Sequence, residues 1–410
     1  MQELKKSVLV SLWFMFLTFP IMVVRVVEKS VVLRWENLAW IGIGSFVLSF
    51  VWRWALRRKE MGRAASREGA NNPGLMAQLA GANPALVRAG SALLLVAFAV
   101  IPWLVTTYQT NILISFMLYV ILGLGLNVIV GIAGLLFLGH AAFYAIGAYS
   151  YALLNQYFGL GFWVALPVGG IVASLAGVAL AFPVLRLRGD YLAIVTLGFG
   201  EIVRLVLENW SSLTGGPSGV SNIPRPGLMN MELSVAGANI YIYYIVFVLA
   251  VITIVAVSRL KDSRIGRALQ ALREDEIACE AMGIDRVGVK LMAFGLGTAW
   301  AGFAGVVFAA KTTFINPASF TFMESAIILS IVVLGGMGSI IGVIVGALVL
   351  ILLPEYLRAF SEYRMLVFGA SMVLIMVFRP QGIITGVRRR YQFRLSESRE
   401  AQREKDAASA

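Results

Sequence analysis

The chain has almost none of the residues that metal and redox chemistry need. Its 410 residues contain one cysteine, Cys279, and one histidine, His140. One cysteine permits no disulfide within the chain, and one of each residue cannot form a cysteine- or histidine-cluster metal site. The sequence also lacks a G-x-x-x-x-G-K-[ST] phosphate loop, so the chain does not bind ATP by that route. We therefore expect no catalytic residue, no metal and no cofactor in this chain.

Charged residues are also scarce, and apolar residues are correspondingly abundant. Only 14% of the residues are charged, 59% are hydrophobic and the mean hydropathy is +0.83, whereas a soluble domain has about 25% charged residues. One membrane crossing takes about 20 apolar residues, so the chain has room for roughly ten to twelve. The sequence predicts an all-α, polytopic transmembrane helix bundle of about 12 helices. The predicted crossings are the apolar runs at about 8–25, 38–56, 89–107, 111–130, 139–158, 162–184, 191–210, 239–258, 289–310, 323–337, 339–353 and 363–378.

Three regions follow from these runs. Residues 1–88 form an N-terminal addition of two helices and a basic connection; its first run follows Lys5 and Lys6 without a small-residue cleavage site, which indicates a retained helix and not a signal peptide. Residues 89–378 form a core of about ten helices. Residues 379–410 form a basic, polar tail that we expect to be disordered.

The positive charges indicate the orientation of the chain. The net charge of +12 comes from Lys and Arg in blocks beside apolar runs, which is typical of topology signals and not of a nucleic-acid surface. The basic connection 57–88, the charged segment 262–285 and the tail are predicted to lie in the cytoplasm, with both chain termini. The connection 211–239 has Arg225 as its single cation and is predicted to lie outside. Five predicted crossings separate 57–88 from 211–239, which fits opposite sides.

The run 191–210 is the doubtful crossing because Glu201, Arg204 and Glu208 share one helical face. We favour an ion-paired face turned into the bundle. A charged residue on a transport pathway and a helix lying in the membrane interface are the alternatives.

Glycines indicate close helix packing and two helix breaks. Small residues recur at every fourth position, which predicts packing seams more than substrate contacts. These residues are Ala293, Gly297, Ala301, Gly305 and Ala309 in one helix, and Gly338, Gly342 and Gly346 in another. Glycines at 131, 134 and 139 and at 335, 336 and 338 predict a break in each half of the core.

Polar residues beside the first break are candidates for lining a translocation path. They are Asn127, Gly139, His140 and Tyr144. For His140 we favour a hydrogen bond to a neighbouring helix over a proton relay. Glu324 is placed at the outer edge of its helix, and no chain of acidic and histidine residues typical of ion-coupled pumps is visible.

The segment 262–285, called the elbow segment below, is dense in charge between two apolar runs. Ile265, Leu269, Leu272 and Cys279 share one helical face, and Gly283 follows. On composition, a solvated loop and a partner-binding surface are equally good interpretations. In the second, charged residues make salt-sensitive contacts and apolar ones enter a groove of the partner. The candidates are Arg264, Arg267, Leu269, Leu272, Arg273, Glu274, Glu276, Ala278, Glu280, Met282 and Gly283.

Four stretches in order resemble one family over about residues 111–378. They are GLNVIVGIAGLLFLGHAAFYAIGAY, GDYLAIVTLGFGEIVRLVLENW followed by TGGPSGV, GRALQALREDEIACEAMGID followed by KLMAFGLGTAWAGFAG, and VVLGGMGSIIGVIVGAL. This combination resembles the M-type permease subunit of branched-chain amino-acid ABC importers.

The resemblance implies a plasma (inner) membrane permease for Leu, Ile or Val that pairs with a second, related permease subunit. It further implies two cytosolic ATPase subunits, which bind ATP and Mg²⁺, and an external solute-binding protein. Residues 264–283 would then couple to the ATPase, and the loop with Gly215, Gly216 and Gly219 would face the binding protein. Three alternatives remain open: the same machine importing urea, short amides or other small solutes, an ion-coupled transporter acting alone, and a non-transporting scaffold.

Overall fold

The computed structural model describes residues 24–27, 30–33, 98–185, 189–227, 235–356 and 382–384, with residues 96, 187, 369 and 373. The chain divides into two compact units, residues 1–94 and 95–410. Most of the two predicted N-terminal crossings, the basic connection 57–88, the run 363–378 and most of the tail lie outside the described residues.

In the first unit the described part is a short antiparallel hairpin. Strand β1 (Val24–Val27) pairs with β2 (Ser30–Leu33), with Val24 opposite Leu33. The first predicted helix ran to residue 25. Its last two residues, 24 and 25, belong instead to strand β1. The run of β-branched residues here favours an extended chain, and this short hairpin is a local exception in a chain whose described part is otherwise helical.

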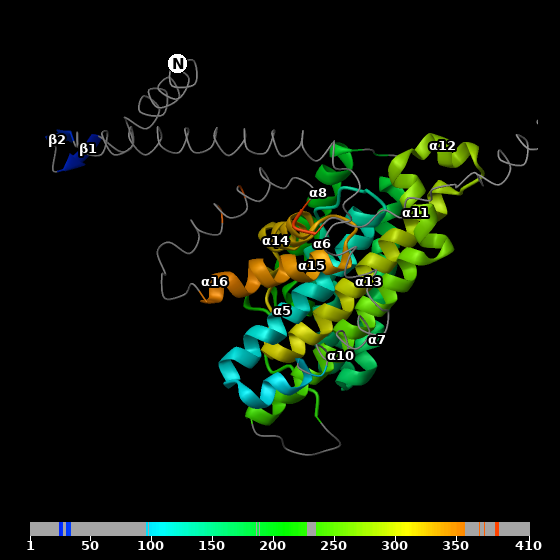
Figure 1. The fold of residues 1–410 in the computed structure, drawn as a ribbon. Coiled ribbons are helices and arrows are strands. Elements are labelled where there is room, and N and C mark those ends of the chain that lie inside the picture. Colours follow the sequence, from blue (N-terminus) through cyan, green and yellow to red (C-terminus); the bar gives the residue numbers. More distant parts are fainter. Residues whose placement is uncertain are drawn as a thin grey trace, which may run out of the picture. The chain divides into compact units, whose positions relative to one another are not determined.

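The second unit is a helix bundle (Figure 1). Its helices are α5 (Thr107–Leu126), α6 (His140–Phe158), α7 (Phe162–Val184), α8 (Asp190–Asn209), α9 (Ser211–Thr214), α10 (Val235–Asp262), α11 (Arg264–Glu274), α12 (Glu276–Ala281), α13 (Arg286–Thr312), α14 (Phe322–Gly335), α15 (Ile340–Ala347) and α16 (Leu353–Tyr356). The short helices η2 (Asn127–Ile132), η3 (Gly216–Ser218), η4 (Pro317–Phe320) and η5 (Leu348–Leu352) connect or extend them.

Five described helical segments are long and apolar enough to cross a membrane. They are Thr107–Ile132, Phe162–Val184, Gly237–Asp262, Arg286–Thr312 and Pro317–Gly335. The chain is thus a multi-pass helical membrane protein, and the predicted total of about 12 helices stays a prediction. The α8 helix is not among the five, and it carries the predicted ion pairs: Arg204 contacts Glu201 at 2.8 Å and Glu208 at 2.7 Å. Its ion-paired side chains are partly buried, whereas Ile202, Leu205 and Val206 of the same helix are exposed. The charged face is therefore partly turned into the bundle, in line with the favoured prediction.

The helix α5 is the centre of the core, where it packs against α10, α13, α14 and α15. The small-residue face of α13 lies in close backbone contact with its neighbours: a Cβ on Gly297 would lie 2.8 Å from the Gly125 carbonyl, and one on Gly305 would lie 2.7 Å from the Ala148 nitrogen. This packing seam is confirmed. In the second seam Gly342 and Gly346 pack on α14, but Gly338 belongs to the break and not to a helix.

Both predicted helix breaks are present. After η2 the chain leaves helical geometry until α6 begins at His140, and Gly134 has φ +74. The second break separates α14 from α15, with φ +118 at Gly336 and +81 at Gly338, a conformation that glycine adopts without steric cost. Residues 382–384 cover this second break, because the Ile383 nitrogen donates to the Leu334 carbonyl at 2.9 Å. This part of the tail is therefore ordered on the core, contrary to the prediction of a frayed tail.

Candidate coupling and docking sites

The elbow segment folds into two short helices at one end of the bundle, the elbow end (Figure 1). Local capping fixes this shape. The Ser263 side chain accepts from the Gly266 nitrogen, and Asp275 Oδ1 accepts from the Ile277 nitrogen at 2.8 Å. Asp285 caps α13 in the same way. Each cap satisfies amides that a helix start leaves free, so the sequence folds the elbow segment as a rigid pair of helices.

The two elbow helices face different surroundings. Leu269 in α11 is fully buried and Leu272 is nearly so. They pack into the core of this chain, so they are not free to enter a partner's groove as predicted. In and beside α12, Met282 is 82% exposed and Ile277 is 67% exposed. Ile277 was absent from the predicted set, although its position opposite the buried Cys279 on a short helix could have indicated it.

The predicted charged contacts of the elbow segment are largely made within the chain. Glu276 Oε1 accepts from Lys290 Nζ at 2.6 Å, and Glu280 contacts Arg286 at 3.1 Å. Arg267 donates to the Asp262 carbonyl. Arg264, Glu274 and Gly283 lie on the exposed side of the segment.

Arg273 reaches from α11 to the first helix break. Its guanidinium donates to the Gly131 carbonyl at 2.5 Å, and its aliphatic stem fills the space beside Gly134, where a Cβ would lie 3.1 Å from the Arg273 Cβ. Gly131 lies in the π-helix η2, near the point where the helix ends, so its carbonyl lacks the amide partner that a continuing helix would provide. Arg273 therefore supplies a charged donor where the bundle has an irregular backbone.

Lys261, at the end of α10, makes the equivalent contact with the second break. Its ammonium donates to the Gly338 carbonyl at 2.7 Å. The two breaks also contact each other, because Asn127 Oδ1 accepts from the Gly338 nitrogen at 2.8 Å. Both irregular segments and the elbow segment thus meet in one hydrogen-bonded cluster, called the break junction: Asn127, Gly131, Lys261, Arg273 and Gly338.

The residues predicted to line a path are buried by packing. Asn127 belongs to the break junction, and Gly139 lies against the Thr196 carbonyl of α8. Tyr144 packs against Phe308 and Phe320 with ring centroids 5.2 and 5.3 Å apart. His140 is fully buried, and its ring interacts with the backbone of Leu122 in the neighbouring helix α5, which supports the predicted contact.

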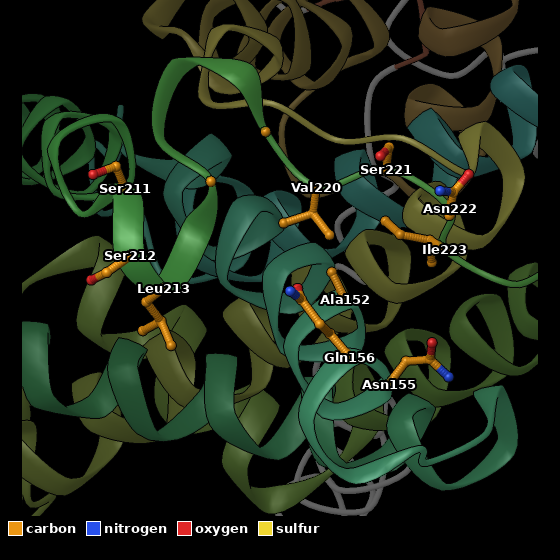
Figure 2. Close-up of a pocket in the computed structure, with 12 residues that line it drawn as sticks. Ala152, Asn155, Gln156, Ser211, Ser212, Leu213, Val220, Ser221, Asn222 and Ile223 are labelled. Atoms are coloured by element: carbon orange, nitrogen blue, oxygen red, sulfur yellow. The ribbon is translucent and has the colours of Figure 1, made fainter.

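The opposite end of the bundle carries a polar pocket. Gly215, Gly216 and Gly219 have φ of +73, +58 and +69 and hold a tight loop that packs on the segment after α13, where Val220 pairs with Ile315. The pocket measures about 420 Å³. Figure 2 shows side chains of α6 between the two loop segments that complete the pocket. Its lining residues are Ala152, Asn155, Gln156, Ser211, Ser212, Leu213, Gly215, Gly219, Val220, Ser221, Asn222 and Ile223.

Comparisons with known proteins agree with this architecture. Residues 108–376 match the family model of the branched-chain amino acid transport system permease component. The chain is 45% identical to the high-affinity branched-chain amino acid transport system permease protein LivM of Salmonella typhimurium, over 88% of this chain and 87% of that protein. It is 50% identical to LivM of Escherichia coli over 69% of this chain and 71% of that protein.

A second kind of permease is also similar. The LivH permease protein of Salmonella typhimurium is 28% identical over 65% of this chain and 91% of its own length. No solved structure matches the chain. Because the family model covers more than half of the chain and the LivM proteins are 45% and 50% identical to it over more than two thirds of its length, this protein belongs to the permease components of the branched-chain amino acid transport system.

Proposed function

We propose that this chain is the M-type permease half of an ATP-driven importer of Leu, Ile and Val. Its partners are a second, H-type permease subunit, two ATPase subunits at the elbow end and a solute-binding protein at the opposite end. The relatives support the pair, since the chain is similar to both LivM and LivH proteins. ATP and Mg²⁺ would bind to the ATPase subunits, and both termini of this chain would be cytoplasmic.

The break junction carries this proposal. A machine driven by a soluble ATPase needs a surface to receive force and a rigid connection to the helices that move. In the elbow segment, Ile277 and Met282 are exposed to meet a partner, while Arg273 connects the segment to the first break. Lys261 and Asn127 connect the second break to the same cluster. A change in the position of the elbow would therefore reach both irregular segments at once.

The polar pocket at the opposite end supports the placement of the binding protein. Neutral amide and hydroxyl groups line it, and they can accept or donate hydrogen bonds to loops of a soluble protein. Binding energy that differs between outward-open and inward-open states is what shifts the permease between them. The selectivity would come first from the binding protein, with the permease accepting a solute already chosen.

Copurification tests the docking surface. In the double variant Ile277→Ser and Met282→Ser we expect the ATPase to be lost from the purified complex, because two exposed apolar contacts are removed from the interface. The matched control is Trp210→Ser, which removes a 54% exposed apolar side chain at the opposite end. An ATPase retained at the wild-type level by the double variant, or ion-driven leucine uptake by the purified chain alone, would overturn the proposal.

A further inference from the structure

Two opposite charges lie within the apolar bundle on the same side of α5. Lys311, in the last turn of α13, donates through Nζ to Ser115 Oγ at 2.6 Å and to the Asn111 carbonyl at 3.2 Å. Glu324, in the first turn of α14, accepts a hydrogen bond from the Tyr119 hydroxyl. Asn111, Ser115 and Tyr119 are four residues apart, so they follow one another along one side of the helix.

The two charges lie at different depths: Lys311 is in the last turn of the span Arg286–Thr312, near one end of the bundle, and Glu324 lies further in. Tyr119 is midway along the 26-residue span Thr107–Ile132, so its partner Glu324 lies level with the middle of that span. Within α14, Glu324 is in the first turn, at the edge of its helix as predicted. The α14 helix begins there because the chain returns into the bundle through η4. Helices that start or end near the midplane are typical of transporter binding sites.

Within the described part of the chain, neither charge is paired with an opposite charge. Among the described residues Lys311 contacts no carboxylate and Glu324 contacts no cation; their hydrogen-bond partners are neutral. Ionisable side chains in the membrane normally pair with each other, because an isolated charge in an apolar environment is costly. The two helix ends lower that cost, since a cation suits a helix C-terminus and an anion suits a helix N-terminus.

The cluster is partly exposed along one side of α5. Asn111, Ser115, Tyr119, Lys311 and Glu324 all keep partial exposure, whereas the residues between them on α5, such as Ile114 and Met117, are buried. Tyr144 lies close enough to Glu324 to interact with it electrostatically, and its ring packs on Phe308 and Phe320. An apolar, aromatic wall thus adjoins the polar side of α5.

We propose that Lys311 and Glu324 form a transient binding site for the two charged ends of a zwitterionic amino acid during translocation. Lys311 receives the carboxylate and Glu324 receives the ammonium group, while the aliphatic side chain lies against the aromatic wall. Ser115 and Tyr119, the neutral partners of the two charges, are one helical turn apart, about 6 Å between their Cβ atoms. Both charged ends of one small amino acid can therefore be met from the same side of α5. The site explains how two unpaired charges of opposite sign can be retained on one side of one helix.

Transport by the complete reconstituted complex tests the proposal. The variants Lys311→Met and Glu324→Gln each keep the shape of the side chain and remove its charge. We expect each to lower the maximal rate of leucine uptake about tenfold or more. The concentration of leucine-loaded binding protein that gives half of the maximal rate should change less than about twofold. The matched control is Glu208→Gln, which removes a charge from the ion-paired face of α8. Uptake within twofold of wild type for the variant lacking both charges would overturn the site.

A thiol-protection experiment covers the case in which a charge variant fails to fold. The only native cysteine, Cys279, is buried, so Ser115→Cys introduces a single accessible thiol beside Lys311. We expect leucine to slow its labelling by a charged thiol reagent at least threefold, and 4-methylvalerate and isoamylamine, which each lack one charged end, to protect less. Equal labelling with and without leucine would refute the site.

This inference deepens the proposed function and rests on it for the transport assay. The labelling experiment needs no ATPase, so it tests the binding site independently of the proposed ATP-driven transport. Loss of protection with an ATPase still bound would refute the site alone.

Discussion

The two helices of the elbow segment show how one charge-dense stretch can have two tasks. The α11 helix is held by its own chain, with Leu269 buried and Arg273 bonded to Gly131. The α12 helix rests on α13 through Glu276 and Lys290, and it presents Ile277 and Met282 outward. This difference indicates that α12 is suited to bind a partner, and that α11 is suited to transmit a movement of the elbow segment to the helix bundle. Substitutions can separate these two tasks.

The largest effect is expected at Gly131, where α11 meets the first break. A Cβ at this position would overlap the Asn127 side chain and lie 2.5 Å from the Gly338 nitrogen. Gly131→Val should therefore destroy the break junction and destabilise the protein by about 3 kcal/mol or more, at the upper end of overpacking effects. The measurement is the thermal midpoint and yield of the purified chain.

The control for Gly131 is Gly198→Ala in α8, where an added Cβ meets nothing within 4 Å. It should leave stability unchanged or slightly higher, since alanine favours a helix over glycine. Equal stability of the two variants would mean that the break junction is not a rigid connection.

The next effect in size is expected at Arg273. Arg273→Ala leaves the exposed surface of α12 in place but removes the donor to the Gly131 carbonyl. We expect the complex to keep its ATPase and its ATP hydrolysis, while leucine transported per ATP falls about tenfold, equivalent to about 1.4 kcal/mol of lost coupling. Arg273→Lys should recover part of the loss because it restores a cationic donor.

Arg267→Ala is the matched control for Arg273. Arg267 lies on the same helix and donates to the nearby Asp262 carbonyl, not to a helix break, so the ratio of transport to hydrolysis should stay near wild type. If Arg273→Ala instead released the ATPase, Arg273 would belong to the docking surface and the division between α11 and α12 would be wrong.

Much of this arrangement follows from local sequence. The packing face of α13 and the ion pairs of Arg204 depend on spacing within one helix, so the sequence predicts them. Glycine density likewise predicts the two breaks, because few other residues adopt the backbone conformations of Gly336 and Gly338.

Contacts between distant segments could not be predicted in this way. The bond from Lys261 to Gly338 joins residues far apart in the sequence, and so does the one from Lys311 to Ser115. Leu269 was assigned to a partner surface because an amphipathic helix shows which face is apolar but not what covers it. The position of Glu324 at the edge of its helix was predicted, but its contact with Tyr119 of α5 was not, because hydropathy locates a helix without showing which helix its first turn meets.

A smaller effect is expected where α12 is held to α13. Lys290 is 6% exposed and Glu276 is 19% exposed, and their 2.6 Å contact is shielded from water. A double-mutant cycle with Lys290→Met and Glu276→Gln should give a coupling energy of about 1–3 kcal/mol, measured by chemical denaturation. Each single variant should also weaken ATPase binding, because α12 would lose its fixed position. A coupling energy near zero would show that α12 is held by its caps alone.

The smallest effect is expected for the exposed pair on the same elbow. Arg286 contacts Glu280 at 3.1 Å, but their side chains are 38% and 58% exposed. Water and salt screen such a pair, so Glu280→Gln should change stability by less than about 1 kcal/mol and the change should vanish at high ionic strength. ATPase binding at low and high salt distinguishes two uses of Glu280: if it only pairs with Arg286, affinity is insensitive to the substitution at both salt concentrations. A salt-sensitive loss of affinity with unchanged stability would instead place Glu280 in the interface beside Met282 and would extend the receiving surface of α12 from apolar to charged contacts.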